Sequence, residues 1–386
     1  MPAPGEIANI SLNTVADVNP CPQRPCVWSG GEGQAGVFDW CGGGFVPRVR
    51  GGFATQWGGG HHAYYGNEVY GFPLDTRLWE CMNAPYPAND ATPINDWGEH
   101  VGPTNPGDPV EPAAAHTYRQ VLGLPPELGG GPQGSTIQMH LSAIGRASIG
   151  RSGAHLFSHA DRRWRRWGDT QPPREAGSLA YMPFALDRSR RCVWGMGSVG
   201  LSSHGARVVR FDLESNKWTV HSTPLSALPF PYFSGAGYTG LEYCPALDVL
   251  VAVEVYKGRP PASGTNPIVC TLSCSNHEEG WRPRETRGFN RQLSTAYSIN
   301  WADFLGALVI YCAQAQNVVH YLKPPSRVDG TWNFSAETFS GAAPAWEAPK
   351  MAACYNRMQP VDDLGCLLWY HGVRSPVQLW RPRMAL

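Results

Sequence analysis

Histidine and tyrosine side chains gather in one short stretch of the sequence, directly after three consecutive glycines. The stretch contains His61, His62, Tyr64, Tyr65 and Asn67. Imidazole groups can ligate metal ions, whereas exposed aromatic rings beside polar groups suit a sugar ring or a protein surface. Neighbouring residues at a strand end point to opposite sides, so His61 and His62 cannot easily share one metal ion. We therefore predict ligand contacts here, with packing between repeats as the alternative.

Motifs of common hydrolases and nucleotide-binding enzymes are absent from the sequence. It contains no G-x-S-x-G, no H-E-x-x-H and no P-loop. A glycosidase would need two facing carboxylates. Asp90, Asp96 and Glu99 lie in one segment, but a solvated loop surface accounts for them as well. We expect no catalytic residue, no cofactor and no bound metal, while an enzymatic function stays open.

The eleven cysteines are an odd number, so they cannot all pair with one another. Most of them lie in or beside strand-like runs, which is typical of small buried apolar residues. Cys21 and Cys26 could form a local disulfide, and whether they are bonded is left open. A zinc site is disfavoured because no second pair of cysteines or histidines with ligand spacing follows closely.

Composition indicates an all-β protein with short strands. Charged residues make up 16% of the chain, against roughly 25% in typical globular proteins. The 44 glycines, 35 prolines and 15 tryptophans favour turns and strands over helices. The formal net charge of zero gives no electrostatic footprint for nucleic acid or an anionic membrane. No apolar run is long enough to span a bilayer, and the first residues do not resemble a secretory signal peptide, so we expect neither membrane insertion nor secretion.

One aromatic spacing recurs along the chain. A phenylalanine stands seven residues before a tryptophan in three clear copies, which are Phe72 and Trp79, Phe157 and Trp164, and Phe211 and Trp218. A hairpin explains the spacing, because polar residues form the turn and both rings then lie on the same side of the sheet. Looser copies end at Trp281 and Trp332. Repeats of this length match four-stranded propeller blades of about 40–50 residues.

The repeats predict a single β-propeller domain of about six blades over residues 1–386. The predicted blades cover 34–82, 114–169, 178–222, 238–286, 294–340 and the residues from 351 onward. The last blade lacks an outer strand, and residues 6–13 form a strand-like run with no other partner. We predict that this N-terminal strand closes the ring, which would leave no unpaired seam between the first and last blades.

Propeller topology places several candidate residues on one face. The loops between second and third strands share that face with the connections between blades, and loops on a rigid scaffold commonly carry function. The connection over residues 83–113, called the insertion below, is unusually long and contains Trp97, and His116 follows it. Another aromatic connection contains Tyr232. We add Trp97, His116 and Tyr232 to the predicted ligand-binding residues.

A basic cluster covers residues 162–166, in the sequence Arg-Arg-Trp-Arg-Arg. Successive residues of a strand alternate between faces, so the cluster does not form one continuous patch. We expect a solvated outer edge of blade two, with contact to a neighbouring subunit as the alternative.

Residues 58–79, GGGHHAYYGNEVYGFPLDTRLW, carry a family resemblance. The glycine run, Tyr70 and Trp79 resemble the kelch repeat, and the whole stretch is similar to kelch-type propellers encoded in tailed-bacteriophage and prophage genomes. The resemblance implies a virion or tail-associated protein that decorates the particle or binds a receptor. Its partners would be other virion proteins, a host surface glycan, or both. It also implies a location in the virion after assembly in the host cytoplasm.

Two other functions stay open beside this expectation of a non-enzymatic binding or structural propeller. The kelch resemblance extends distantly to galactose oxidase, whose copper is held by two histidines and two tyrosines, with a cysteine cross-linked to one tyrosine. A matching set cannot be placed in this chain, which disfavours copper chemistry. A carbohydrate-active or galactose-oxidase-like enzyme is one alternative, and a free-standing cellular scaffold for protein interactions is the other.

Overall fold

The computed structural model describes most of the chain. The described residues are 1–21, 33–59, 64–87, 92–101, 110–140, 143–144, 147–148, 152–168, 171–173, 175, 179, 182–196, 207–224, 239–254, 268–288, 297–312, 317–341 and 354–383. Within these ranges the regular structure is almost entirely β-strand, as the composition predicts. The described helices have five residues or fewer: α1 (Val15–Val18) and the 3-10 helices η1 (Gly33–Val37), η2 (Val49–Gly51), η3 (Pro126–Leu128), η6 (His277–Glu279) and η8 (Asp362–Leu364).

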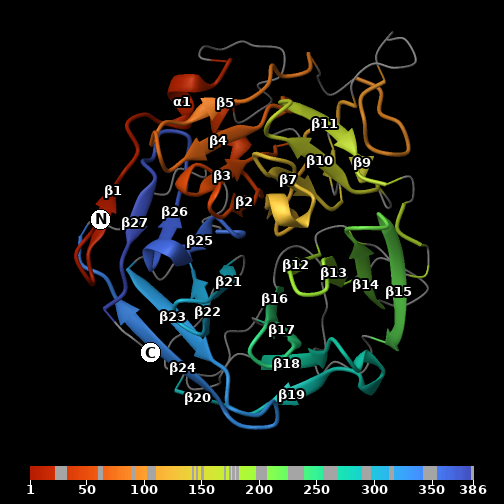
Figure 1. Cartoon of the computed structure of the whole chain (residues 1–386). Coiled ribbons are helices and arrows are strands. Elements are labelled where there is room, and N and C mark those ends of the chain that lie inside the picture. Colours follow the sequence, from red (N-terminus) through yellow and green to blue (C-terminus); the bar gives the residue numbers. More distant parts are fainter. Residues whose placement is uncertain are drawn as a thin grey trace.

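Six small sheets of the described chain form a ring, and the protein is a six-bladed β-propeller (Figure 1). Blade one contains β2 (Gly43–Val46), β3 (Phe53–Gln56), β4 (Tyr70–Pro73) and β5 (Glu80–Cys81). Blade two contains β6 (Val121–Leu124), β7 (Ser135–Gln138), β10 (His155–Ser158) and β11 (Arg163–Arg166). A short hairpin of β8 (Ala143–Ile144) and β9 (Ala147–Ser148) follows β7. Blade three contains β12 (Phe184–Asp187), β13 (Cys192–Met196), β14 (Arg207–Asp212) and β15 (Lys217–Pro224).

The second half of the ring repeats this arrangement. Blade four contains β16 (Thr239–Cys244), β17 (Val249–Glu254), β18 (Ile268–Ser273) and β19 (Arg282–Arg284). Blade five contains β21 (Ser298–Ala302), β22 (Ala307–Tyr311), β23 (Val318–Lys323) and β24 (Trp332–Thr338), and β20 (Thr286–Arg287) pairs in parallel with β24. Blade six contains β25 (Met358–Val361), β26 (Cys366–Trp369), β27 (Gln378–Trp380) and β1 (Ile7–Asn9). The first strand of each blade lies innermost, and first strands of neighbouring blades are in contact between β2 and β6, β12 and β16, β16 and β21, and β21 and β25.

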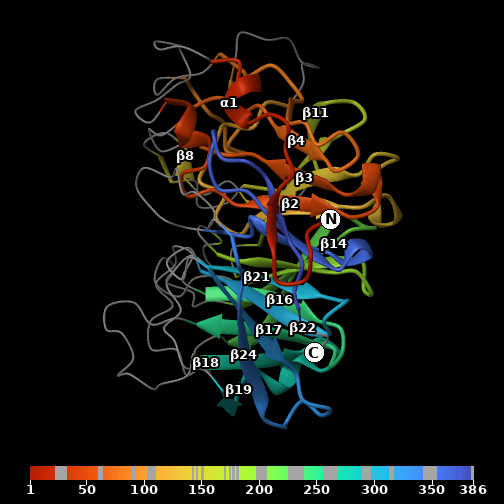
Figure 2. The ribbon, with the colours of Figure 1, turned by 90° about the vertical axis from the view of Figure 1, so that its left-hand side faces the viewer.

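The N-terminal strand closes the ring, as predicted. β1 pairs antiparallel with β27, with Ile7 opposite Trp380 and Asn9 opposite Gln378. The side-chain amide of Gln378 also donates to Asn9 Oδ1 at 2.8 Å. Figure 1 shows β1 on the outer edge of the blue blade, and Figure 2 shows the red N-terminal segment beside the C-terminal strands. Blade six is therefore built from both ends of the described chain.

The repeated aromatic spacing forms the same hairpin contact in three blades. The ring centroids lie 5.2 Å apart for Phe72 and Trp79, 5.3 Å for Phe157 and Trp164, and 5.0 Å for Phe211 and Trp218. In the last two pairs the phenylalanine stands directly opposite the tryptophan across the hairpin. Such contacts stabilise aromatic pairs by about 0.5–1.5 kcal/mol beyond their burial. The hairpin explanation of the spacing is confirmed.

Apolar side chains fill the interfaces between neighbouring blades. Ile137 of blade two packs in one cluster with Phe184 of blade three, and Leu368 of blade six packs with Phe72 of blade one. All four side chains are at most 1% exposed. Full burial of such side chains stabilises a fold by about 1.5–3 kcal/mol each. The core is thus a ring of inter-blade contacts, which makes each blade depend on its two neighbours.

No helix in the described part of the chain is long and apolar enough to cross a membrane.

Candidate functional site

The predicted ligand-binding residues differ in their exposure. Tyr64 and Asn67 are fully buried, and His116 is 4% exposed. The half-buried members are Tyr65 and Trp97. The members outside the described residues are His61, His62 and Tyr232. A fully buried side chain cannot contact a partner from solution. Packing between repeats, the alternative given above, therefore describes Tyr64 and Asn67 better than contact with a ligand.

Tyr64 belongs to a buried polar cluster in blade one. Its hydroxyl and that of Tyr70 both donate to the carboxyl group of Glu68. The side-chain amide of Asn19 donates to the Tyr70 hydroxyl at 2.7 Å. Burial raises the pKa of Glu68, although the hydrogen bonds from the two tyrosines act in the opposite direction. The cluster joins the N-terminal segment to blade one.

Asn67 connects blade one to the two ends of the insertion. Its amide nitrogen donates to Glu111 at 2.6 Å, and its amide oxygen accepts the backbone N–H of Tyr86 at 2.7 Å. The backbone carbonyl of Asn67 accepts the indole N–H groups of Trp57 at 3.1 Å and Trp164 at 3.2 Å. The loop that ends at Asn67 and the insertion therefore lie together, which is the arrangement that the topology predicts.

Glu99 anchors the middle of the insertion to blade two. Its side chain is 6% exposed and accepts hydrogen bonds from Arg166 Nε at 2.7 Å and Nη2 at 2.5 Å. His155 Nε2 lies 3.1 Å from Glu99 Oε1, and the amide of Asn95 donates to Oε2 at 2.9 Å. Burial opposes ionisation of Glu99, but the hydrogen bonds from Arg166, His155 and Asn95 outweigh it and lower the pKa to about 2. Glu99 is therefore an ionised, fully engaged anchor.

Aromatic contacts complete the attachment of the insertion. The guanidinium of Arg166 lies 4.6 Å from the ring centroid of Trp97, a cation–π contact. A Cβ atom at Gly153 would lie 2.1 Å from the Trp97 ring, so the close approach needs glycine. The rings of Tyr86 and His100 stack with centroids 4.8 Å apart. The described part of the insertion is thus packed on the ring and keeps Trp97 and Tyr86 half-buried at its surface.

The basic cluster of residues 162–166 lies at the exposed outer strand of blade two and also makes specific contacts. Arg166 binds Glu99, and Arg162 Nη2 lies 2.7 Å from Glu80 of blade one. Trp164 is 4% exposed and packs between blades one and two. The four arginines of the cluster are exposed at the outermost strand of blade two, as the expected solvated edge requires, whereas Trp164 is buried. The carboxylates that pair with Arg162 and Arg166 come from blade one and the insertion, and the local pattern does not reveal them.

His116 lies in an aromatic group after the insertion. Its ring stacks on Trp40 with centroids 5.7 Å apart and an interplanar angle of 19°. Its Nδ1 atom lies 3.3 Å from the hydroxyl of Tyr118. With 4% exposure, His116 packs inside the protein.

A cavity of about 310 Å³ lies on the propeller axis at the other end of the ring. Each blade contributes to its lining, for example through Phe45, Leu122, Arg188, Glu242, Asp303 and Gln359. Leu122, Glu242 and Gln359 lie within innermost strands, whereas several other lining residues directly follow such strands, namely Pro47, Arg188, Pro245, Asp303 and Asp362. The insertion instead connects to the beginning of an innermost strand, β6. The cavity and the insertion therefore lie at opposite ends of the ring.

Charged side chains of both signs surround this axial cavity. Burial raises the pKa of Glu242 to about 8, with opposing effects from the backbone N–H of Tyr243 and the charge of Arg188. Burial also raises the pKa of Asp362. Arg188 is exposed at the cavity, and the indole N–H of Trp301 donates to Asp303 at 2.6 Å. The cavity thus combines carboxyl groups, a guanidinium and an aromatic ring.

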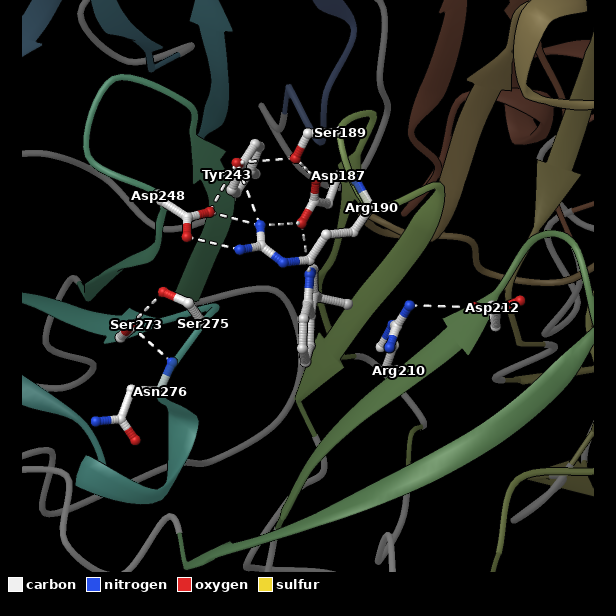
Figure 3. Close-up of polar contacts among 11 residues, drawn as sticks. Asp187, Ser189, Arg190, Arg210, Asp212, Tyr243, Asp248, Ser273, Ser275 and Asn276 are labelled. Carbon is white, nitrogen blue, oxygen red and sulfur yellow. Dashed lines mark hydrogen bonds and ion pairs between the residues drawn. The ribbon is translucent and has the colours of Figure 1, made fainter.

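An ion-pair cluster between blades three and four supports one wall of the cavity (Figure 3). Arg190 donates to both carboxylate oxygens of Asp248, at 2.5 and 2.6 Å, and to Asp187 at 3.2 Å. The hydroxyl of Tyr243 donates to Asp248 at 3.0 Å and lies 3.2 Å from that of Ser189. Tyr243 and Ser189 both line the cavity. The cluster therefore fixes two lining residues from different blades.

Sequence reasoning did not single out the axial cavity. Three of its four charged residues directly follow an innermost strand, Arg188 after β12, Asp303 after β21 and Asp362 after β25, while Glu242 lies within β16. A charged residue in the same position of three predicted blades is the signal that could have indicated it. The signal is weak, because a charge after a strand is equally typical of a solvated turn.

Most of the cysteines carry buried thiols. Nine described cysteines are not disulfide-bonded, and all but Cys81 are buried. Burial raises the pKa of Cys41 to about 11, which makes its thiolate scarce at neutral pH. Cys21 is disulfide-bonded, and Cys26 lies outside the described residues. Among the described residues, no group of three or more His, Cys, Asp and Glu side chains is arranged to hold a metal ion.

No family model and no curated protein matches the sequence. Among solved structures, the chain is similar to a structural-genomics protein of unknown function from Bacteroides thetaiotaomicron. The two share 11% sequence identity over 97% of this chain and 74% of that chain, with a TM-score of 0.43.

Proposed function

We propose that the chain is a non-enzymatic binding propeller of the kelch type and a component of a tailed-bacteriophage particle. The closed ring would be the rigid support, and the insertion would contact a neighbouring virion protein or a host surface glycan. The observation that carries the proposal is the attachment of Glu99 to Arg166, which holds the insertion on blade two. A surface that is ordered before binding loses less conformational entropy when a partner arrives.

The residue types on the insertion support a contact role. Trp97 and Tyr86 remain half-buried, and Val101 is 49% exposed. Aromatic residues and arginine are enriched in protein interfaces, where they form the contacts of highest energy. Trp97 and Arg166 lie together through the cation–π contact. These residues would form the centre of the proposed binding surface.

The kelch assignment rests on the sequence resemblance and on the backbone of the glycine run. Gly58 and Gly59 have φ angles of 145° and 132°, which side-chain-bearing residues rarely adopt. A Cβ atom at Gly59 would also lie 2.7 Å from the carbonyl oxygen of Tyr64. The backbone path therefore requires glycine at these two positions. This requirement comes from the backbone geometry, so it supports the kelch resemblance independently of the sequence similarity.

Location in a particle tests the proposal. Particles would be induced from the strain that carries the gene, purified on a density gradient and probed with an antibody against this chain. The proposal expects the chain to sediment with the particles after nuclease and high-salt washing, in a fixed ratio to a capsid protein. Recovery of the chain only in the soluble fraction, with intact particles beside it, would contradict a virion role.

A carbohydrate-active enzyme is the second candidate, and one observation favours it. The lining of the axial cavity includes Glu242, whose pKa burial raises to about 8, together with Asp303 and Asp362. A protonated carboxylic acid near an ionised one is the pair that glycoside hydrolysis uses. Release of nitrophenol from a panel of nitrophenyl glycosides, abolished by Glu242→Gln, would support this candidate. If no glycoside in the panel is hydrolysed, the result contradicts the enzymatic candidate and favours the non-enzymatic binding function.

A further inference from the structure

Asn356 lines the axial cavity, and its side chain carries a buried acceptor with no partner among the described residues. The residue is 3% exposed, and its Oδ1 atom has no hydrogen-bond partner among the described residues. It also lines the cavity and has a φ angle of 66°. Most buried polar atoms in proteins are hydrogen-bonded, because leaving one unpaired costs about 1–3 kcal/mol. A rotation of this side chain toward the cavity would present the acceptor to a ligand hydroxyl.

The other polar groups of the cavity are fixed by the blades. The Asn300 amide donates to the backbone carbonyl of Met358 at 2.7 Å, which orients its side chain. Asp362 accepts the backbone N–H of Phe304 at 3.2 Å. Trp301 is held by its hydrogen bond to Asp303. These contacts leave a preformed lining, and preformed concave sites with a few oriented polar groups are typical of small-molecule binding.

We propose that the axial cavity binds a neutral polyhydroxylated ligand of about monosaccharide size, through Asn356, Asn300 and Asp362 with Trp301 beside the ring. A volume of about 310 Å³ lies at the lower end of the range for small-molecule sites. Hydroxyl groups both donate and accept, so they match a lining that contains amides, carboxyl groups and the guanidinium of Arg188. This site does not depend on the proposed binding role of the insertion, which lies at the other end of the ring, and it is the cavity that the second candidate function uses.

Ligands of other charge fit the lining less well. An anion would face Asp303 and Asp362 as well as Arg188, and like charges repel. A polyamine would face Arg188, and the raised pKa of Glu242 leaves that group largely uncharged at neutral pH. The described chain also lacks a group of three or more side chains suited to a metal ion. The charges of the lining residues therefore favour a neutral ligand with several hydroxyl groups.

Binding of defined sugars to the full chain tests the inference. The probes are methyl α-glucopyranoside, methyl β-galactopyranoside and methyl N-acetyl-β-glucosaminide, measured by saturation-transfer NMR and titration calorimetry. Inorganic phosphate and spermidine serve as the anionic and cationic rivals. We expect at least one sugar to bind at millimolar or lower concentration, with neither rival competing. Binding of phosphate or spermidine without any sugar overturns the proposal, and so does the absence of sugar binding.

Two substitutions and one control localise the binding. Asn356→Gly keeps access to the positive φ angle and removes the acceptor, so we expect about 10-fold weaker binding with little change in melting temperature. Asp362→Asn should weaken binding similarly. Asp363→Asn is the matched control, because Asp363 is exposed in the same turn and pairs with Arg48 outside the cavity. Equal affinity of all three variants and the wild type would contradict this site.

A further experiment distinguishes two sources of the sugar, the end of a glycan chain and a free monosaccharide. A trisaccharide that carries the bound sugar at its non-reducing end is compared with the methyl monosaccharide. Equal affinity supports recognition of a glycan terminus, and loss of binding supports recognition of a free sugar. A chain in which the insertion is replaced by a linker should bind the sugar normally. Loss of sugar binding in that chain, with unchanged melting, would contradict the independence of the two sites.

Discussion

The carboxylate of Glu99 and the guanidinium of Arg166 form two hydrogen bonds, at 2.7 and 2.5 Å, between the insertion and blade two. The two residues are separated by 67 positions in the sequence. Hydrogen bonds to a charged partner contribute about 1.5–3 kcal/mol each when they are well formed. Arg166 is partly exposed, with 41% of its side chain accessible, so solvent reduces this contribution.

Replacing Glu99 should loosen the insertion. Glu99→Gln keeps the shape and removes the charge, so we expect faster hydrogen exchange over residues 92–101 and a loss of about 1–2 kcal/mol in the free energy of unfolding. Asp96→Asn is the matched control, because Asp96 is exposed in the same segment. Both quantities are measured by hydrogen-exchange mass spectrometry and urea unfolding. Unchanged exchange in Glu99→Gln would contradict the anchor.

The ion pair between Glu99 and Arg166 should stabilise the fold less at acidic pH. The pKa of Glu99 is lowered to about 2 from an ordinary value of 4.5, so its stabilising effect is fully present above about pH 4.5. It is lost as the pH falls through about 2. The difference in stability between wild type and Glu99→Gln should therefore shrink as the pH decreases from 4.5. A difference that stays constant down to pH 2.5 would show that the charge does not contribute.

Glu242 should produce the opposite pH dependence. Burial raises its pKa from 4.5 to about 8, so the folded protein keeps a proton that the unfolded chain releases between these values. Stability should therefore decrease as the pH rises through this window. Glu242→Gln removes this dependence, and we expect it to be about 2 kcal/mol more stable than wild type at pH 8.5 and nearly equal at pH 4.5. Melting curves of both proteins across this range measure the difference, and parallel curves would refute the shift.

Arg190 should contribute to the junction of blades three and four. Arg190→Met removes its hydrogen bonds to Asp187 and Asp248, and Asp187 is fully buried. We expect a loss of about 2–3 kcal/mol in the free energy of unfolding. Arg287→Met is the control, because Arg287 pairs with Glu285 at the surface and such pairs contribute less than about 1 kcal/mol. Equal effects of the two substitutions in urea unfolding would exclude a special role for Arg190.

The closing strand should be necessary for a monomeric propeller. Deleting residues 1–10 removes β1 and exposes the edge of β27, which other chains can then pair with. We expect a lower melting temperature and aggregation in light scattering. A synthetic peptide of residues 1–14 should restore the melting temperature, whereas a scrambled peptide should not. A truncated chain that stays monomeric and melts as the wild type does would contradict ring closure by β1.

The fold was predictable because its signals are local. Phe157 and Trp164 are seven residues apart, and a two-stranded hairpin accounts for that spacing without knowledge of the rest of the chain. The closing strand followed from a missing outer strand in blade six and an unpaired run near Ile7. Both inferences use strand pairing, which depends on backbone geometry that repeats from blade to blade.

The candidate sites were less predictable because they depend on long-range side-chain pairing. Tyr64 seemed suited to ligand contact, but Glu68 and Tyr70 supply partners that allow its burial. The insertion was recognisable by its length, yet its attachment requires Glu99 to meet Arg166 from another blade. The axial cavity combines single residues from six blades, so no contiguous motif indicates it.

The most direct test of the central claim is particle incorporation and host attachment with the insertion exchanged. In the test variant a Gly-Ser linker replaces residues 88–109, and Asp96→Asn is the control with an intact insertion. Hydrogen exchange outside blades one and two must match the wild type, which shows that the propeller has folded. The account predicts that the control behaves as the wild type, while the linker variant is at least ~10-fold depleted from purified particles or supports ~10-fold less adsorption to host cells. A folded linker variant that enters particles and supports adsorption at the wild-type level would contradict the claim that the insertion is the binding surface.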